Sequence, residues 1–218
     1  MRMTTDLDAQ WAVRWVRETA RVVAENRALL IDLDRAIGDA DHGENLDRGF
    51  SAVVAKLDSA DVPSTPAAVL KQVAMTLMST VGGAAGPLYG TAFLRAATSV
   101  GDADTIDAEA AAAMIRAARD GIVARGKAEV GDKTMVDAWT PASESAETAA
   151  QAGASAPDVL AAAANAAHAG AVATEPLIAR KGRASYLGER SAGHQDPGAV
   201  STALILQAAA DAAGGAVA

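Results

Sequence analysis

The sequence predicts an all-α fold: an up-and-down bundle or barrel of eight amphipathic antiparallel helices. Half of the 218 residues are hydrophobic but only 3% are aromatic, and alanine dominates the apolar segments, which favours helices over sheet. Apolar residues recur at helical intervals between short breaks, whereas no strand-like alternation extends over more than a few residues. We therefore expect one domain that spans residues 1–218 and is built around one core.

The first four helices each show an apolar stripe or a start signal. They are expected over residues 7–33, 44–59, 65–81 and 87–100. In the first, Trp11 and Trp15 lie one turn apart. One face of the second carries Leu46, Phe50, Val53, Val54 and Leu57. Pro87 should lie in the first turn of the fourth helix, where its missing N–H group has no partner to lose.

Four more helices are expected in the second half of the chain. They should span residues 107–125, 132 to about 150, 157–178 and 198–213. Asp132 is expected to be the N-cap of the sixth helix, because its carboxylate can accept from a free N–H group of the first turn. A proline inside a helix removes one hydrogen bond, so we expect a kink or a restart at Pro141.

Composition and charge exclude several classes of partner and chemistry. The net charge of -8 argues against nucleic acid, because binding a phosphate backbone needs a basic surface. With no cysteine in the chain, disulfides, thiolate metal sites and cysteine nucleophiles are excluded. The N-terminus has no apolar signal segment, and no run approaches the roughly 18 apolar residues of a membrane span. We expect a soluble cytoplasmic protein that does not bind a membrane.

If neighbouring helices alternate in direction, four loops fall at one rim of the barrel. These loops span residues 34–45, 82–87, 126–131 and 180–198, and they hold nearly all the unusual chemistry of the chain. The opposite rim receives ordinary turn sequences at 59–66, 101–107 and 151–157. This asymmetry predicts a single functional site at the first rim.

The first of these loops concentrates carboxylates. Asp34, Asp39 and Asp41 lie within eight residues at the end of an expected helix, where negative charge opposes the helix dipole unless a cation is shared. Carboxylate oxygens are ligands that Mg²⁺ accepts together with phosphate oxygens. A calcium EF-hand is excluded, because counting from Asp39 places Glu44 where that loop needs glycine. The alternative interpretation is a solvated acidic turn.

Two other loops suit an anion. The turn at 82–87 presents backbone N–H groups at the start of a helix, which favours phosphate, although a plain tight turn has the same pattern. Four basic residues gather in the last loop of an acidic protein: Arg180, Lys181, Arg183 and Arg190. Such a run is usually a solvated loop, but near a metal-bound phosphate it could pair with the phosphate oxygens. Ser185 and His194 lack a third orienting residue, so a hydrolase triad is not favoured.

Four segments follow one another along the chain: GDADHG at 38–43, GGAAGPLYG at 82–90, GDKTMVD at 131–137 and GRASYLGERSAGHQDPG at 182–198. Together they resemble the nucleotide-binding L subunit (DhaL type) of dihydroxyacetone kinase. The resemblance covers essentially the whole chain. It implies a barrel of eight antiparallel helices that binds an adenine nucleotide, ADP or ATP, at one rim through two Mg²⁺ ions.

The resemblance also implies site residues by motif position. The metal ligands would be Asp34, Asp39 and Asp41. The phosphates would be held by His42, Gly43, Glu44, Asn45, Gly83, Ala84 and Ala85. Gly126 and Met135 would border the adenine, and Arg183, Asp196, Pro197 and Gly198 would complete the pocket. Many relatives carry serine where this chain has Ala84 and Ala85, so a hydroxyl contact to phosphate is in doubt while the backbone N–H contacts remain.

The implied activity is phosphoryl transfer from the Mg²⁺-bound nucleotide to a triose held covalently by a separate K subunit. No catalytic side chain is expected from this chain, which would act by positioning and by charge neutralisation. A link to a multiphosphoryl protein of the phosphotransferase system is favoured over exchange of ATP by a kinase for a related ketose. A non-catalytic nucleotide-sensing module of the same fold is the alternative from another class. The sequence leaves the oligomeric state open, a homodimer included.

Overall fold

The computed structural model describes residues 7–59 and 63–214. The N-terminal residues that were searched for a signal segment, and part of the expected turn at 59–66, lie outside these ranges. The helices are α1 (Ala9–Glu25), α2 (Arg27–Ile37), α3 (His42–Asp58), α4 (Pro66–Thr80), α5 (Ala85–Val100), α6 (Ala108–Gly126), α7 (Val136–Gln151), α8 (Ala156–Ala173), the 3₁₀ helix η1 (Arg183–Ser191) and α9 (Pro197–Ala213). Two short strands, β1 (Leu7–Asp8) and β2 (Thr105–Ile106), pair antiparallel.

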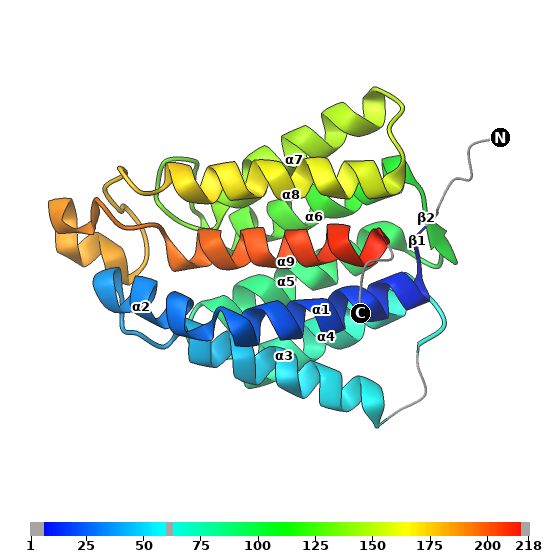
Figure 1. Cartoon of the computed structure of the whole chain (residues 1–218), viewed down its shortest axis with the longest axis horizontal. Coiled ribbons are helices and arrows are strands. Elements are labelled where there is room, and N and C mark those ends of the chain that lie inside the picture. Colours follow the sequence, from blue (N-terminus) through cyan, green and yellow to red (C-terminus); the bar gives the residue numbers. More distant parts are fainter. Residues whose placement is uncertain (1–6, 60–62, 215–218) are drawn as a thin grey trace.

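The long helices close into a ring, which confirms the predicted helical architecture (Figure 1). From α3 to α9 each helix packs against the next, and α9 packs back on α1, which also contacts α3 and α4. In Figure 1, α2 lies at one end of the molecule and the β1–β2 pair at the other. The expected loops of the first rim therefore gather at the end that carries α2.

The tryptophans of α1 fasten that helix to α9. The rings of Trp11 and Trp15 stack with centroids 5.2 Å apart. Their indole N–H groups donate to the carbonyls of Ala209 and Ile205, at 3.1 and 2.9 Å. A buried tryptophan needs such a partner for its N–H group, so the pair sets the register of α1 on α9 while both rings stay in the core.

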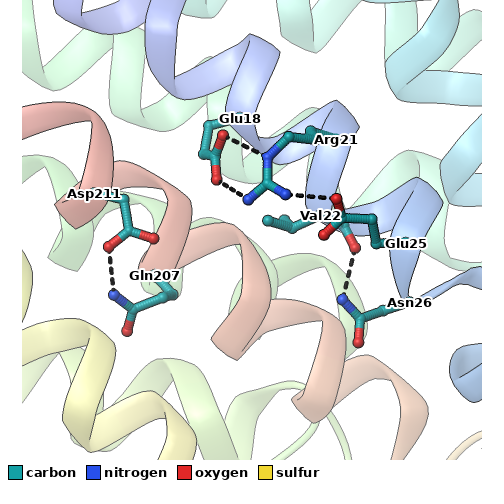
Figure 2. A network of polar contacts seen from close by, with 7 residues as sticks. All are labelled: Glu18, Arg21, Val22, Glu25, Asn26, Gln207 and Asp211. Carbon is teal, nitrogen blue, oxygen red and sulfur yellow. Dashed lines mark hydrogen bonds and ion pairs between the residues drawn. The ribbon is translucent and has the colours of Figure 1, made fainter. Parts of the chain in front are cut away.

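The expected first helix is divided in two at Asn26. The Asn26 side chain donates to the carbonyl of Val22 at 2.8 Å, and its backbone N–H donates to the same oxygen. A short amide side chain that bonds to the local backbone competes with helix hydrogen bonds, which explains the break. Figure 2 shows this contact beside Arg21, which bridges the buried Glu18 and the exposed Glu25.

The expected N-cap of α7 was wrong. Asp132 is not its N-cap, because the Asp132 carboxylate accepts from Glu129 N–H within the preceding loop. Asp137, in the first turn of α7, instead accepts from the N–H groups of Gly131 and Thr134. The helix also does not restart at Pro141 but runs through it to Gln151. No helix among the described residues is long and apolar enough to cross a membrane.

Candidate functional site

A pocket opens at the α2 end, where five segments distant in sequence meet. Its lining comprises Asp34, Ile37, Gly38, Asp39, Asp41, His42, Asn45, Gly82, Gly83, Ala84, Ala85, Leu88, Lys133, Thr134, Met135, Lys181, Gly182, Arg183, Ala184, Asp196, Pro197 and Gly198. Three of the four loops expected at this rim contribute directly. The loop after α6 contributes only its end at Lys133–Met135, beyond the expected break at 126–131.

Three carboxylates form the acidic wall of the pocket. One oxygen each from Asp34, Asp39 and Asp41 can be chosen so that all three lie within 4.8 Å of one another. Asp34 is buried in the last turn of α2, and its Oδ2 accepts from the backbone N–H groups of Asp41 and His42, at 2.8 and 3.1 Å. These bonds fix the carboxylate before any cation binds.

The backbone around Asp34 leaves little freedom. Ala40 adopts a φ of 63°, an unusual value for a residue with a side chain, and this bend turns the chain back toward Asp34. A Cβ atom at Gly38 would lie 2.0 Å from Asp34 Oδ1. Glycine at 38 is therefore required by the close approach of the carboxylate.

Three helix N-termini face the same pocket: those of α3, α5 and α9. The N-cap residues of α3 and α5 make no side-chain hydrogen bond to the helix, so the N–H groups of these first turns can donate to an anion, except that of His42, which already donates to Asp34. At α9, Asp196 Oδ2 accepts from Ala199 N–H at 2.7 Å. The pocket thus combines a cation-binding wall with anion-binding helix ends.

A buried hydrogen-bond chain holds His42 in place. Its Nε2 lies 2.9 Å from Ser201 Oγ, which in turn lies 2.7 Å from the hydroxyl of Tyr89. Burial lowers the pKa of His42, and the nearby Asp34 and Asp41 oppose that shift only in part. These hydrogen bonds couple the start of α3 directly to α9 through Ser201, and α9 to α5 through Tyr89. Ser201 and Tyr89 were missed as supporting residues, because nothing in the sequence shows that they meet His42.

Charges of both signs continue around the pocket. Arg183 of η1 pairs with Asp39 at 2.9 Å, although its side chain is 70% exposed, so solvent weakens the attraction. Burial raises the pKa of Asp196 to about 7; the hydrogen bond from Ala199 N–H opposes the shift, and Asp137 adds to it. An additional cation or a bound proton would therefore stabilise the acidic groups.

Most of the expected site residues line this pocket. Asp34, Asp39, Asp41, His42, Asn45, Gly83, Ala84, Ala85, Met135, Arg183, Asp196, Pro197 and Gly198 do so, whereas Gly43, Glu44 and Gly126 are not part of the lining. Gly43 packs against α2, where a Cβ atom would lie 2.4 Å from Arg27 O. Glu44 points to Arg27 on the surface, at 2.7 Å. Gly126 lies behind the lining residue Leu88.

Comparison with known proteins identifies the family. Residues 36–211 match the DAK2 domain. The chain is 47% identical to the Escherichia coli (strain K12) PEP-dependent dihydroxyacetone kinase, ADP-binding subunit DhaL, over 92% of this chain and 95% of that relative. It is 42% identical to the Lactococcus lactis PTS-dependent dihydroxyacetone kinase, ADP-binding subunit DhaL, over 89% of this chain and 93% of that relative.

A solved structure shares the fold. The dihydroxyacetone kinase of C. freundii in complex with AMP-PNP and Mg²⁺ aligns with a TM-score of 0.68 and 25% identity, over 92% of this chain. This chain spans only 33% of that longer protein. The DhaL relatives, in contrast, match it over nearly their entire length. The chain therefore belongs to the DAK2 domain family, together with the ADP-binding DhaL subunits of dihydroxyacetone kinases.

Proposed function

We propose that this chain is the nucleotide-binding subunit of a dihydroxyacetone kinase, acting on a short ketose that a separate K subunit holds. One observation carries the proposal: three carboxylates and the N-termini of α3 and α5, whose N-cap residues make no side-chain hydrogen bond, line one pocket. A nucleotide with its metal needs both, since the cation seeks carboxylate oxygens and the phosphates seek free N–H groups.

The donor set fits Mg²⁺. Asp34, Asp39 and Asp41 supply only oxygen ligands, and Asp34 is already oriented by two backbone N–H groups. These residues would hold the metal, with two ions as the expected number. Bound Mg²⁺ would neutralise phosphate charge and so favour phosphoryl transfer. ADP or ATP would then contact those of the other proposed site residues that line the pocket, with backbone N–H groups standing in at Ala84 and Ala85 for the hydroxyl contact.

The names of the DhaL relatives, which are ADP-binding subunits, support a separate partner subunit. The L-erythrulose 1-kinase of Mycolicibacterium smegmatis is 37% identical, but this chain spans only 33% of that protein. The chain is more similar to the ADP-binding DhaL subunits, at 47% and 42% identity. These relatives are named as PEP-dependent and PTS-dependent kinases, so a phosphotransferase-system donor fits better than free ATP.

The test reconstitutes the reaction. The purified chain is mixed with a dihydroxyacetone-binding K subunit, dihydroxyacetone and Mg²⁺, and triose phosphate is measured. One arm supplies ATP; the other supplies phosphoenolpyruvate with the phosphotransferase proteins. We expect product in the second arm, only when this chain is present. Absence of product in both arms would contradict the kinase function and favour the nucleotide-sensing alternative.

Removing one proposed metal ligand tests the site itself. Asp39→Ala should abolish Mg²⁺-dependent ADP binding in calorimetry while the far-ultraviolet circular dichroism stays unchanged, because Asp39 lies in a loop outside the helices. Asp58→Ala is the matched control, since Asp58 is also an exposed partner of an arginine, at 2.6 Å from Arg17. Tight binding retained by Asp39→Ala would refute the metal assignment.

A further inference from the structure

Lys133 is a buried lysine without a carboxylate partner in hydrogen-bond contact. Its side chain is 1% exposed, and Nζ donates to four backbone carbonyl oxygens. They belong to Thr174 at 2.8 Å, Leu177 at 3.1 Å, Glu175 at 3.2 Å, and His194. An ammonium has three N–H groups, so all three are hydrogen-bonded and at least one is shared between two acceptors.

The four acceptors lie at the two ends of one segment. We call residues 178–193 the lid. Thr174, Glu175 and Leu177 precede it, just beyond the end of α8, and His194 follows it. A backbone bond from Gly193 N–H to Glu175 O, at 2.8 Å, also joins the two ends. The Lys133 ammonium thus joins the backbone just before the lid to the backbone just after it.

The lid carries part of the pocket wall. Its residues Lys181 to Ala184 line the pocket, and Arg183 pairs with Asp39 on the opposite side. Two residues of the lid, Ala179 and Ala184, pack with Ile37 of α2 in a small apolar cluster separate from the main core. Because so few apolar contacts hold the lid, the hydrogen bonds at its two ends contribute a larger share of what keeps it in place.

Electrostatics explain why an ammonium suits this position. The Thr174 carbonyl, at the C-cap of α8, lies at the negative end of the helix dipole, which favours a cation. Burial lowers the pKa of Lys133, while Asp196, Glu175 and Asp137 counteract that effect. Lys133 also holds a φ of 62°, a costly conformation for a residue with a side chain, and the four bonds offset that cost.

We propose that Lys133 is a positioning residue that clasps both ends of the lid and thereby sets how slowly bound nucleotide leaves. The inference rests on the proposed nucleotide site, because the lid forms one wall of it. Nucleotide cannot be released past this wall until the lid moves. Loss of the ammonium would free both ends of the lid without touching the metal ligands.

The first experiment compares Lys133→Met with Lys71→Met, the same change at an exposed lysine of α4. In hydrogen exchange without nucleotide, only Lys133→Met should speed exchange of the lid amides, while α1, α4 and α5 stay protected. In stopped-flow with a fluorescent ADP and Mg²⁺, its dissociation rate should rise by about tenfold, as expected for losing one or two hydrogen bonds to a charged group. An unchanged dissociation rate would overturn the inference.

A chemical rescue separates the charge from the shape of the side chain. The chain has no cysteine, so Lys133→Cys provides one unique thiol. Alkylating the unfolded variant with 2-bromoethylamine and refolding it restores an ammonium at lysine length, whereas 1-bromopropane gives the neutral equivalent. Slow dissociation should return only with the amine. Equal dissociation rates for the two products would show that the ammonium has no positioning role.

The two proposals fail in different ways. If wild-type protein binds no Mg²⁺-ADP, the proposed function fails, but lid exchange in Lys133→Met still reports on the clasp. If wild type binds and Lys133→Met behaves like Lys71→Met in both measurements, the inference fails while the proposed function stands.

Discussion

Asp196 combines two tasks in one side chain. Its carboxylate caps α9 by accepting from Ala199 N–H, and it also lines the pocket. Capping alone needs no buried charge, since asparagine caps a helix about as well as aspartate. The pocket environment instead determines its protonation, because burial raises its pKa to about 7 from 3.8.

This shift predicts how stability depends on pH in metal-free protein. Between about pH 4 and pH 7 the folded Asp196 binds more protons than the unfolded one, so its contribution to the free energy of unfolding falls as pH rises and levels off above pH 7. Asp196→Asn keeps the cap and removes the titration. The stability difference between wild type and Asp196→Asn should therefore shift against wild type as pH rises through this window.

Urea denaturation with EDTA at several pH values measures the difference. His42 and Glu18 have lowered pKa values, by burial and by the Arg21 hydrogen bond respectively, and they give the opposite trend in both proteins. Comparing the two proteins cancels those contributions. A difference that stays constant from pH 4 to pH 8 would contradict the raised pKa of Asp196.

At the scale of elements, the contact between α7 and α8 connects packing to the site. A Cβ atom on Gly170 would lie 2.3 Å from Asp137 O and 2.9 Å from Pro141 Cγ. Pro141 has no N–H group for Asp137 O, and Gly170 of α8 lies against that oxygen instead. The Asp137 side chain shapes the loop around Lys133 by accepting from the N–H groups of Gly131 and Thr134.

Gly170→Ala should therefore push α7 from α8. We expect the free energy of unfolding to fall by about 1–3 kcal/mol, as for other overpacked sites. Because Asp137 would move with α7, nucleotide affinity should fall as well. Thermal unfolding and calorimetry with Mg²⁺-ADP measure the two effects. Gly214→Ala is the control, since its Cβ atom would make only an ordinary contact, 3.6 Å from Asp211 O. Equal stability of the two variants would show that a Cβ atom at position 170 does not force α7 and α8 apart.

The sequence predicted the helices better than the contacts between them. Periodicity placed most helices within a few residues, because each stripe lies within one element. The break at Asn26 and the wrong cap at Asp132 depend on which of several possible local hydrogen bonds forms. The spacing of apolar residues carries no information on that choice. Most expected site residues meet in the pocket, but Gly126 lies behind it. Lys133 was missed because its partners lie 41 to 61 residues away.

At the scale of the whole molecule, the three carboxylates and the lid lie outside the main core. The main core runs through the barrel from the β1–β2 pair to Ala85 and Met135 at the pocket, and it includes the tryptophans of α1. The lid and the end of α2 share only the small cluster of Ile37, Ala179 and Ala184. The barrel should therefore stay folded when the pocket is empty.

This separation predicts the effect of removing the metal. Dialysis against EDTA should release bound ADP and leave the helix content unchanged, because the core makes no use of the carboxylates. Without the metal, Asp34, Asp39 and Asp41 repel one another, with Arg183 as an exposed partner of Asp39. Hydrogen exchange should therefore accelerate at residues 38–45 and in the lid but not in α5 or α6. Native mass spectrometry and circular dichroism on the same sample measure the two effects. Intact helices without ADP are the expected result and would show that the barrel folds independently of the pocket's ligands. Loss of helix together with ADP would contradict the prediction and show that the barrel needs the occupied pocket to stay folded.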